Sequence, residues 1–270
     1  MRTQRVNRTL ISVAAGSFVI MGLAAVSPAW AQADTALDAA EAMAGMLDGA
    51  QAGVSGADLM SALEGAAAAG EPMALWHLGN MYENGNGVAK DPVKAFGYFS
   101  QIANEYANAA PEGIEADIVA QSFVKVGEYY REGLPGADLR ADPGKADRLI
   151  LHAADYFGEA EAQYRVGERY LASGGGNHLR GARYLYSAAQ KGYVPAQAKL
   201  GDILFNGNGI EAQPVEGLMW LTVAGRRSAG TGDENWIRDM LTSAMSVASP
   251  EQRQEATRLA DALSPRFSGL

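Results

Sequence analysis

The chain contains no cysteine and only three histidines. It can therefore form no disulfide and carry no lipid on a cysteine, so its stability must come from packing. The histidines, His77, His152 and His178, are far apart, and none has a second histidine three to five residues away, as zinc sites require. We expect neither a metal nor a cofactor.

Positive charge is also scarce. The 22 basic and 31 acidic residues give a formal charge of −9, and no basic cluster is interleaved with aromatic residues. Such a chain repels phosphate backbones, so nucleic acid is not an expected partner.

The sequence has a single long apolar run, from Leu10 to Val26, preceded by three arginines and followed by Pro28. This order, with the small residues Ala29 and Ala31 before Gln32, predicts a signal peptide over residues 1–31, cleaved after Ala31. Its removal would leave a charge of −12. An uncleaved anchor stays open, because the run approaches the length that spans a bilayer. With no later span expected, the predicted location is the periplasm, with secretion as the alternative.

A short pattern recurs four times after the leader. An aliphatic residue and a glycine are followed, three positions after the glycine, by an aromatic or aliphatic residue. The pairs are Leu78-Gly79, Val126-Gly127, Val166-Gly167 and Leu200-Gly201, and their followers are Tyr82, Tyr130, Tyr170 and Leu204. Two apolar side chains four apart lie on one face of a helix, so each match predicts a first helix.

The repeated glycines require a packing explanation, because glycine inside a helix costs about 1 kcal/mol relative to alanine. A small residue stands five positions before each: Ala74, Ser122, Ala162 and Ala196. Small side chains let helices approach closely. We therefore expect Gly79, Gly127, Gly167 and Gly201 to be structural contacts between helices.

Each first helix is followed by a glycine-rich turn and a second helix. Asp91-Pro92, Asp142-Pro143 and Gln213-Pro214 are typical helix starts; the third unit lacks this proline. The predicted fold is all-α: a solenoid of stacked antiparallel helix pairs, with four units and a leading half repeat over residues 58–230. Residues 32–57 are predicted to be a linker, a weak helix or disordered.

Residues 231–270 are predicted to form a helical cap that closes the last repeat, and a partner-binding helix is the alternative. Ser249, Pro250 and Gln252 make a capping box at the start of its second helix. The key glycines are 48, 40 and 34 residues apart, which indicates insertions at residues 104–121 and 134–141. Insertions in solenoids map to loops on one face, often the binding face.

No residue set supports catalysis. Ser122 and Lys125 match a serine–lysine motif, but Ser122 occupies the repeat's small-residue position and no Lys-Thr-Gly follows. Glu159 and Glu161, two apart, point in different directions on a helix. We therefore expect a protein that is not an enzyme.

Polar residues recur beside the key glycines. They are His77, Lys125, Arg165 and Lys199 two positions before, and Asn80, Glu128, Glu168 and Asp202 one position after. In three units a base and an acid are three apart, which predicts pairs within each helix. One interpretation is a polar track for a protein partner; the other is a solvated face that pairs with itself.

The units resemble the Sel-one-like repeat, a relative of the tetratricopeptide repeat, from Ala74 to about Gly225. With the leader, the order of the insertions, and the runs 129–135 and 158–163, the chain also resembles the periplasmic negative regulators of exopolysaccharide production of rhizobia and related alphaproteobacteria. The resemblance implies a protein that binds the periplasmic domain of a membrane sensor histidine kinase and represses exopolysaccharide and motility signalling. The alternative function is an envelope adaptor or accessory protein for cell-wall or polysaccharide enzymes.

Overall fold

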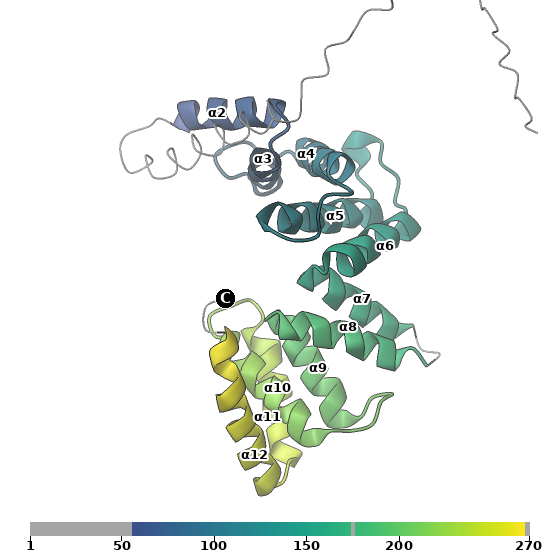
Figure 1. The fold of residues 1–270 in the computed structure, drawn as a ribbon, viewed down its shortest axis with the longest axis vertical. Coiled ribbons are helices and arrows are strands. Elements are labelled where there is room, and N and C mark those ends of the chain that lie inside the picture. Colours follow the sequence, from purple (N-terminus) through teal and green to yellow (C-terminus); the bar gives the residue numbers. More distant parts are fainter. Residues whose placement is uncertain (1–55, 174–175, 268–270) are drawn as a thin grey trace, which may run out of the picture.

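The computed structural model describes residues 56–173 and 176–267, where the chain is built from helices (Figure 1). The predicted leader and all but the last two residues of the predicted linker lie outside these ranges. In the described ranges a single isolated bridge joins Leu134 and Leu139. No helix there has the length and apolarity needed to cross a membrane.

Consecutive helices pack against one another as hairpins and confirm the predicted α-solenoid. A leading helix, α2, is followed by units 1 to 4, which pair α3 with α4, α5 with α6, α7 with α8 and α9 with α10. The pair α11 and α12 ends the array. The bounds are α2 Gly56–Ala68, α3 Pro72–Asn84, α4 Pro92–Glu105, α5 Ile114–Glu132, α6 Pro143–His152, α7 Ala160–Ala172, α8 His178–Gln190, α9 Val194–Asn206, α10 Pro214–Arg227, α11 Glu234–Val247 and α12 Pro250–Leu263.

Several helices begin or end at residues that the sequence indicates. The carboxylate of Asp91 accepts hydrogen bonds from the backbone N–H groups of Val93 and Lys94, both at 3.1 Å, and that of Asp142 caps α6 by accepting from the N–H of Lys145 at 2.8 Å. Gly85 and Gly207 end α3 and α9 in the left-handed conformation that glycine adopts without strain. The predicted caps and glycine turns are confirmed at these positions.

A backbone hydrogen bond closes the hairpin in three units. The N–H of Asp91 donates to the carbonyl of Tyr82 at 2.8 Å, and the N–H of Gln213 donates to that of Leu204 at 2.7 Å. In unit 2 the N–H of Asp142 makes the same bond to Tyr130 at 2.6 Å, although the turn is longer. The extra residues therefore leave the helix pairing unchanged.

The four key glycines are contacts between the two helices of a unit, as predicted. A Cβ added to Gly79 would lie 2.5 Å from the ring of Phe99, and one on Gly201 would lie 2.8 Å from the carbonyl oxygen of Gly217. Gly127 packs in the same way on Ile150, and Gly167 on Leu185. A side chain at any of these positions would clash with the second helix of the unit.

The interior divides into two main apolar clusters. The first extends from Leu63 to Val166 and the second from Ala182 to Phe267. In the second, Ala256 and Ala260 of α12 are fully buried, and α12 packs on α10. The capping box of Ser249 and Gln252 is present at the start of α12.

Local structure is more helical than predicted in three places. The first insertion was predicted as a loop, but its second half, from Ile114 onward, forms the first turns of α5, because Ile118 and Val119 are buried there. The second insertion is a short 3-10 turn at Pro135–Ala137. A π-helical turn, η2 (Ala153–Phe157), follows α6 and was not foreseen.

Candidate partner-binding surface

The eight predicted groove residues lie on the first helices α3, α5, α7 and α9, but the predicted pairing was wrong. The bases pair with acids on the preceding first helix. Lys125 reaches Glu83 at 2.8 Å, Arg165 reaches Glu128, and Lys199 reaches Glu168 at 3.8 Å. We call this series of pairs the ladder; it joins neighbouring units.

The ends of the ladder explain the remaining predicted residues. Asn80 donates to the carbonyl of Trp76 at 2.8 Å, and Glu83 pairs with Lys125 in its place. His77 belongs to the first unit, which has no earlier first helix in the described ranges. At the other end, Asp202 accepts a hydrogen bond from Asn206 of its own helix at 2.8 Å.

Arg165 is the most connected cation of the ladder. Besides Glu128, it pairs with Glu161 of its own helix at 2.6 Å. Burial lowers the pKa of its guanidinium, but the hydrogen bonds and charges of Glu161 and Glu128 outweigh burial and raise it. Arg165 therefore stays charged and fixes the junction between α5 and α7.

Tyrosines lie between the charged pairs. Burial raises the pKa of the Tyr129 hydroxyl, and the charge of Glu83 raises it further. Burial likewise raises the pKa of Tyr164, the neighbouring carboxylate of Glu168 raises it further, and the Tyr164 ring lies 5.3 Å from that of Tyr193. A half-buried surface of tyrosine and arginine has the composition of protein interface cores.

An acidic hollow of about 400 Å³ adjoins the ladder at unit 2. Its wall combines the carboxylates of Glu83, Glu128 and Glu132 with Lys90 and Tyr129. In the part of the chain that the structure describes, no group of three histidines, cysteines or acids is placed to hold a metal ion. The hollow is thus an acidic surface feature beside the insertion at 134–141.

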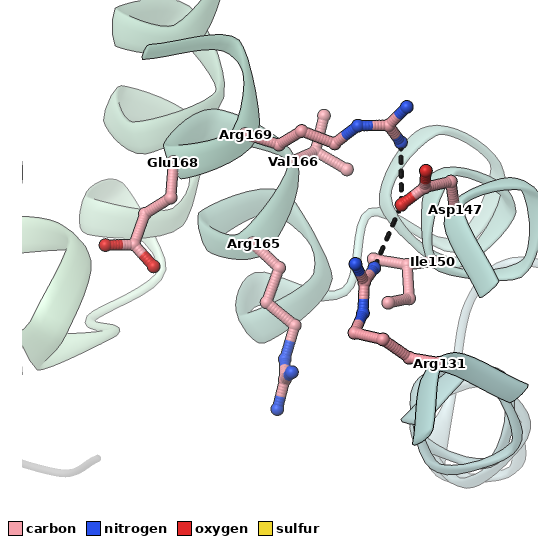
Figure 2. A pocket seen from close by; sticks show the side chains of 7 residues that line it. All are labelled: Arg131, Asp147, Ile150, Arg165, Val166, Glu168 and Arg169. Carbon is pink, nitrogen blue, oxygen red and sulfur yellow. Dashed lines mark hydrogen bonds and ion pairs between the residues drawn. The ribbon is translucent and has the colours of Figure 1, made fainter. Parts of the chain in front are cut away.

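A second hollow of about 210 Å³ lies between α5, α6 and α7 (Figure 2). Asp147 of α6 contacts Arg131 of α5 at 2.9 Å and Arg169 of α7 at 2.8 Å. Arg165 and Glu168 of the ladder line its rim, and Ile150 and Val166 contribute apolar wall. We call it the arginine pocket.

Sequence reasoning missed Arg131, Asp147 and Arg169. Their positions relative to the key glycine carry no recurring charge, because Met81 occupies in unit 1 the place that Arg169 takes in unit 3. Only the stacking of three helices brings them together. The repeat pattern therefore contained no signal for the pocket.

A third hollow, of about 510 Å³, is more apolar and lies on other elements. It is formed by α8, α9 and the start of α10, and it includes the exposed side chains of Leu179 and Tyr186. None of the ladder residues lines it.

Ser122 does not act as a nucleophile in this arrangement. Its side chain is fully buried, and its hydroxyl donates to the carbonyl of Ile118 at 2.8 Å. Lys125 is directed to Glu83. The serine–lysine spacing is therefore a coincidence of the repeat.

Comparison with known proteins identifies the repeats and the relatives. The Sel1 repeat family matches residues 72–105, 160–193 and 194–228, which are units 1, 3 and 4. Two proteins named exopolysaccharide production negative regulator are each 31% identical to the chain. The one from Rhizobium meliloti (strain 1021) aligns over 71% of this chain and 69% of its own length, and the one from Rhizobium leguminosarum bv. viciae over 73% and 72%. The chain belongs to this family of Sel1 repeat regulators.

The solved Sel1 repeat protein from Oxalobacter formigenes has the same fold. The two superpose with a TM-score of 0.55 at 23% identity, covering 76% of this chain and 78% of the other. Unit 2, which the Sel1 repeat family does not match, contains the insertion at 134–141, follows the one at 104–121, and contributes to the acidic hollow and the arginine pocket. Unit 2 thus shares the acidic hollow with unit 1 and the arginine pocket with unit 3.

Proposed function

We propose that the chain is an exported negative regulator that binds the periplasmic domain of a membrane sensor histidine kinase and represses exopolysaccharide and motility signalling. The observation that carries the proposal is the likeness, over more than two thirds of both chains, to two proteins named exopolysaccharide production negative regulators. The expected leader at residues 1–31 supports export.

The surface supports a binding role. Solenoids present extended surfaces on which a partner contacts several units at once. The ladder and its two hollows span α3 to α9 and combine arginine, tyrosine and carboxylates, the side chains that supply orientation and affinity in interfaces. The proposal requires no catalytic residue.

A direct binding measurement tests the proposal. The full-length chain, tagged at its C-terminus, is expressed in its own host, crosslinked, and purified, and the captured proteins are identified by mass spectrometry. We expect a membrane sensor kinase, and we expect its purified periplasmic domain to bind the mature chain in solution. Deleting the gene should raise exopolysaccharide, and a copy lacking residues 1–31 should not restore repression.

The opposite results would discard the proposal. If the purified kinase domain does not bind and exopolysaccharide is unchanged in the deletion strain, the chain is not this regulator. Recovery of cell-wall or polysaccharide enzymes alone would instead favour an envelope accessory protein.

A further inference from the structure

The arginine pocket has more positive than negative charge at its centre. One oxygen of Asp147, Oδ1, accepts a hydrogen bond from Arg131 and forms an ion pair with Arg169, so two guanidinium groups share one carboxylate (Figure 2). The two arginine side chains are 45% and 59% exposed, whereas Asp147 is 19% exposed. The carboxylate is thus covered, and the cations are accessible.

Each guanidinium keeps donors for a second acceptor. A guanidinium has five N–H donors in a fork that matches a carboxylate, and one nitrogen of each arginine contacts Asp147. Asp147 also holds both guanidinium groups in place, which reduces the side-chain entropy that the two arginines would lose when a ligand binds. The pair is therefore a prepared site for an anion.

The size and walls of the pocket indicate which anion it takes. Its volume of about 210 Å³ is below the roughly 300 Å³ at which pockets for small molecules begin, so it suits a single side chain. The apolar wall from Ile150 and Val166 suits the methylene groups of aspartate or glutamate. Positive charge in a chain of net charge −9 gives an acidic segment a defined place to bind.

We propose that Arg131 and Arg169 bind a side-chain carboxylate from an acidic segment of the partner protein. This inference rests on the proposed function in that the partner is a protein. The pocket adjoins the ladder through Arg165 and Glu168, so a segment held there continues onto the first helices of units 3 and 4.

Binding of fluorescein-labelled poly-L-glutamate to the mature chain at low salt, measured by fluorescence anisotropy, tests the site directly. The test variant is R131Q/R169Q. The control R238Q/R258Q removes the same charge from two exposed, ion-paired arginines on α11 and α12. We expect the test variant to bind at least about tenfold more weakly, since hydrogen bonds to charged groups are lost, and the control to bind within about twofold of the unchanged chain.

A third variant should change the affinity for poly-L-glutamate in the opposite direction. Asp147→Asn removes the carboxylate that competes for the two guanidiniums, so it should bind poly-L-glutamate more tightly. Asp261→Asn makes the same change of charge at an exposed, ion-paired aspartate on α12, so it should tighten binding less than Asp147→Asn does. Thermal unfolding of all variants ensures that changes in affinity are compared between folded proteins.

Three results would overturn the inference. In the first, both double variants weaken binding equally, which means that net charge alone attracts the probe. In the second, Asp147→Asn fails to tighten binding. In the third, polygalacturonate binds through Arg131 and Arg169 while poly-L-glutamate does not, which assigns the pocket to an acidic polysaccharide.

Capture of the sensor kinase domain separates this inference from the proposed function. If the unchanged chain and R131Q/R169Q capture the domain equally, the pocket is not part of the interface, and the proposed function stands. If the unchanged chain captures no sensor domain, the proposed function fails, and the anisotropy titration decides about the carboxylate site alone.

Discussion

At the scale of single residues, glycine determines how closely the helices of a unit can pack. In unit 4, a Cβ on Gly217 would lie 2.6 Å from the carbonyl oxygen of Gly201, and one on Gly201 would lie 2.8 Å from that of Gly217. Backbone faces backbone at this crossing. Gly97 in α4 has no atom within 4 Å of an added Cβ.

Substituting alanine at these two positions should have opposite effects. Gly201→Ala should lower the free energy of unfolding by about 1–3 kcal/mol, because the backbones must separate. Gly97→Ala should raise it by about 0.5–1 kcal/mol, because alanine is the better helix former in open space. Urea denaturation measures both; equal effects would exclude close packing as the reason for Gly201.

A second residue of interest is Glu159, whose carboxylate caps α7 by accepting from the N–H of Ala162. Burial raises the pKa of this carboxyl, and nearby Glu161 adds to the rise, although backbone hydrogen bonds and Lys191 act in the opposite direction. The folded chain therefore holds a proton here at a higher pH than the unfolded chain does. Stability from this group is present at low pH and is lost as pH rises through the folded-state pKa.

Glu159→Gln removes this titration. The stability of the variant relative to the unchanged chain should therefore increase between pH 4 and pH 7, as judged by urea denaturation at each pH. Glu255 should change the pH dependence of stability in the opposite direction, because its hydrogen bond with Arg258 lowers its pKa. Glu255→Gln should lose stability relative to the unchanged chain over the same range; the same trend in both variants would contradict the assignment.

At the scale of elements, side chains from one unit close the turn before it. Gln163 and Gln197, which follow the small alanines, donate to the carbonyls of Ala154 and Ala189 near the ends of the preceding second helices. Lys191 donates to the carbonyl of Gly158, one inter-unit turn earlier. Tyr106 does the same for Gly70 at 2.8 Å. These bonds satisfy carbonyls that a helix end leaves open.

Two neighbouring arginines at the end of α10 allow the effect of such a turn-closing bond to be compared with that of a surface ion pair. Arg227 donates to the carbonyl of Gly192 and to Gln197, whereas Arg226 pairs with Asp261 at the surface. Arg227→Met should cost about 1–3 kcal/mol, because it leaves the buried amide oxygen of Gln197 without its donor. Arg226→Met should cost less than about 1 kcal/mol. Equal shifts in urea denaturation would show that the bonds of Arg227 to Gly192 and Gln197 stabilise the fold no more than a surface ion pair does.

The elements also show how far sequence reasoning extends. Repeated glycines, Asp-Pro starts and the capping box at Ser249 predicted the helices, because these signals are local. The π-helical turn at Ala153–Phe157 and the partners of Lys125 and Arg165 were not predictable, because they depend on how separate units stack. The same holds for the arginine pocket, which needs three helices.

At the scale of the whole molecule, the two apolar clusters meet where α7 gives way to α8. Phe99 is fully buried in the first cluster and Leu218 in the second. In solenoids, each unit is stabilised mainly by its neighbours, so stability is distributed along the chain. Disturbing one cluster should leave the distant units of the other folded.

Hydrogen exchange can test this independence. Phe99→Ala should cost about 3–5 kcal/mol locally and accelerate amide exchange in α3 to α5, while α9 to α12 keep their protection. Leu218→Ala should give the reverse distribution. Uniform acceleration along the chain in either variant would show that the molecule unfolds as one cooperative body.

The ladder has a direction as well as a composition. Each of its three bonds between units takes its base from the later unit and its acid from the earlier one. Reading from α3 to α9 is therefore not equivalent to reading from α9 to α3. A peptide that binds along this surface meets a different order of charges when it lies in the opposite direction. The surface therefore favours one direction of a bound peptide over the other.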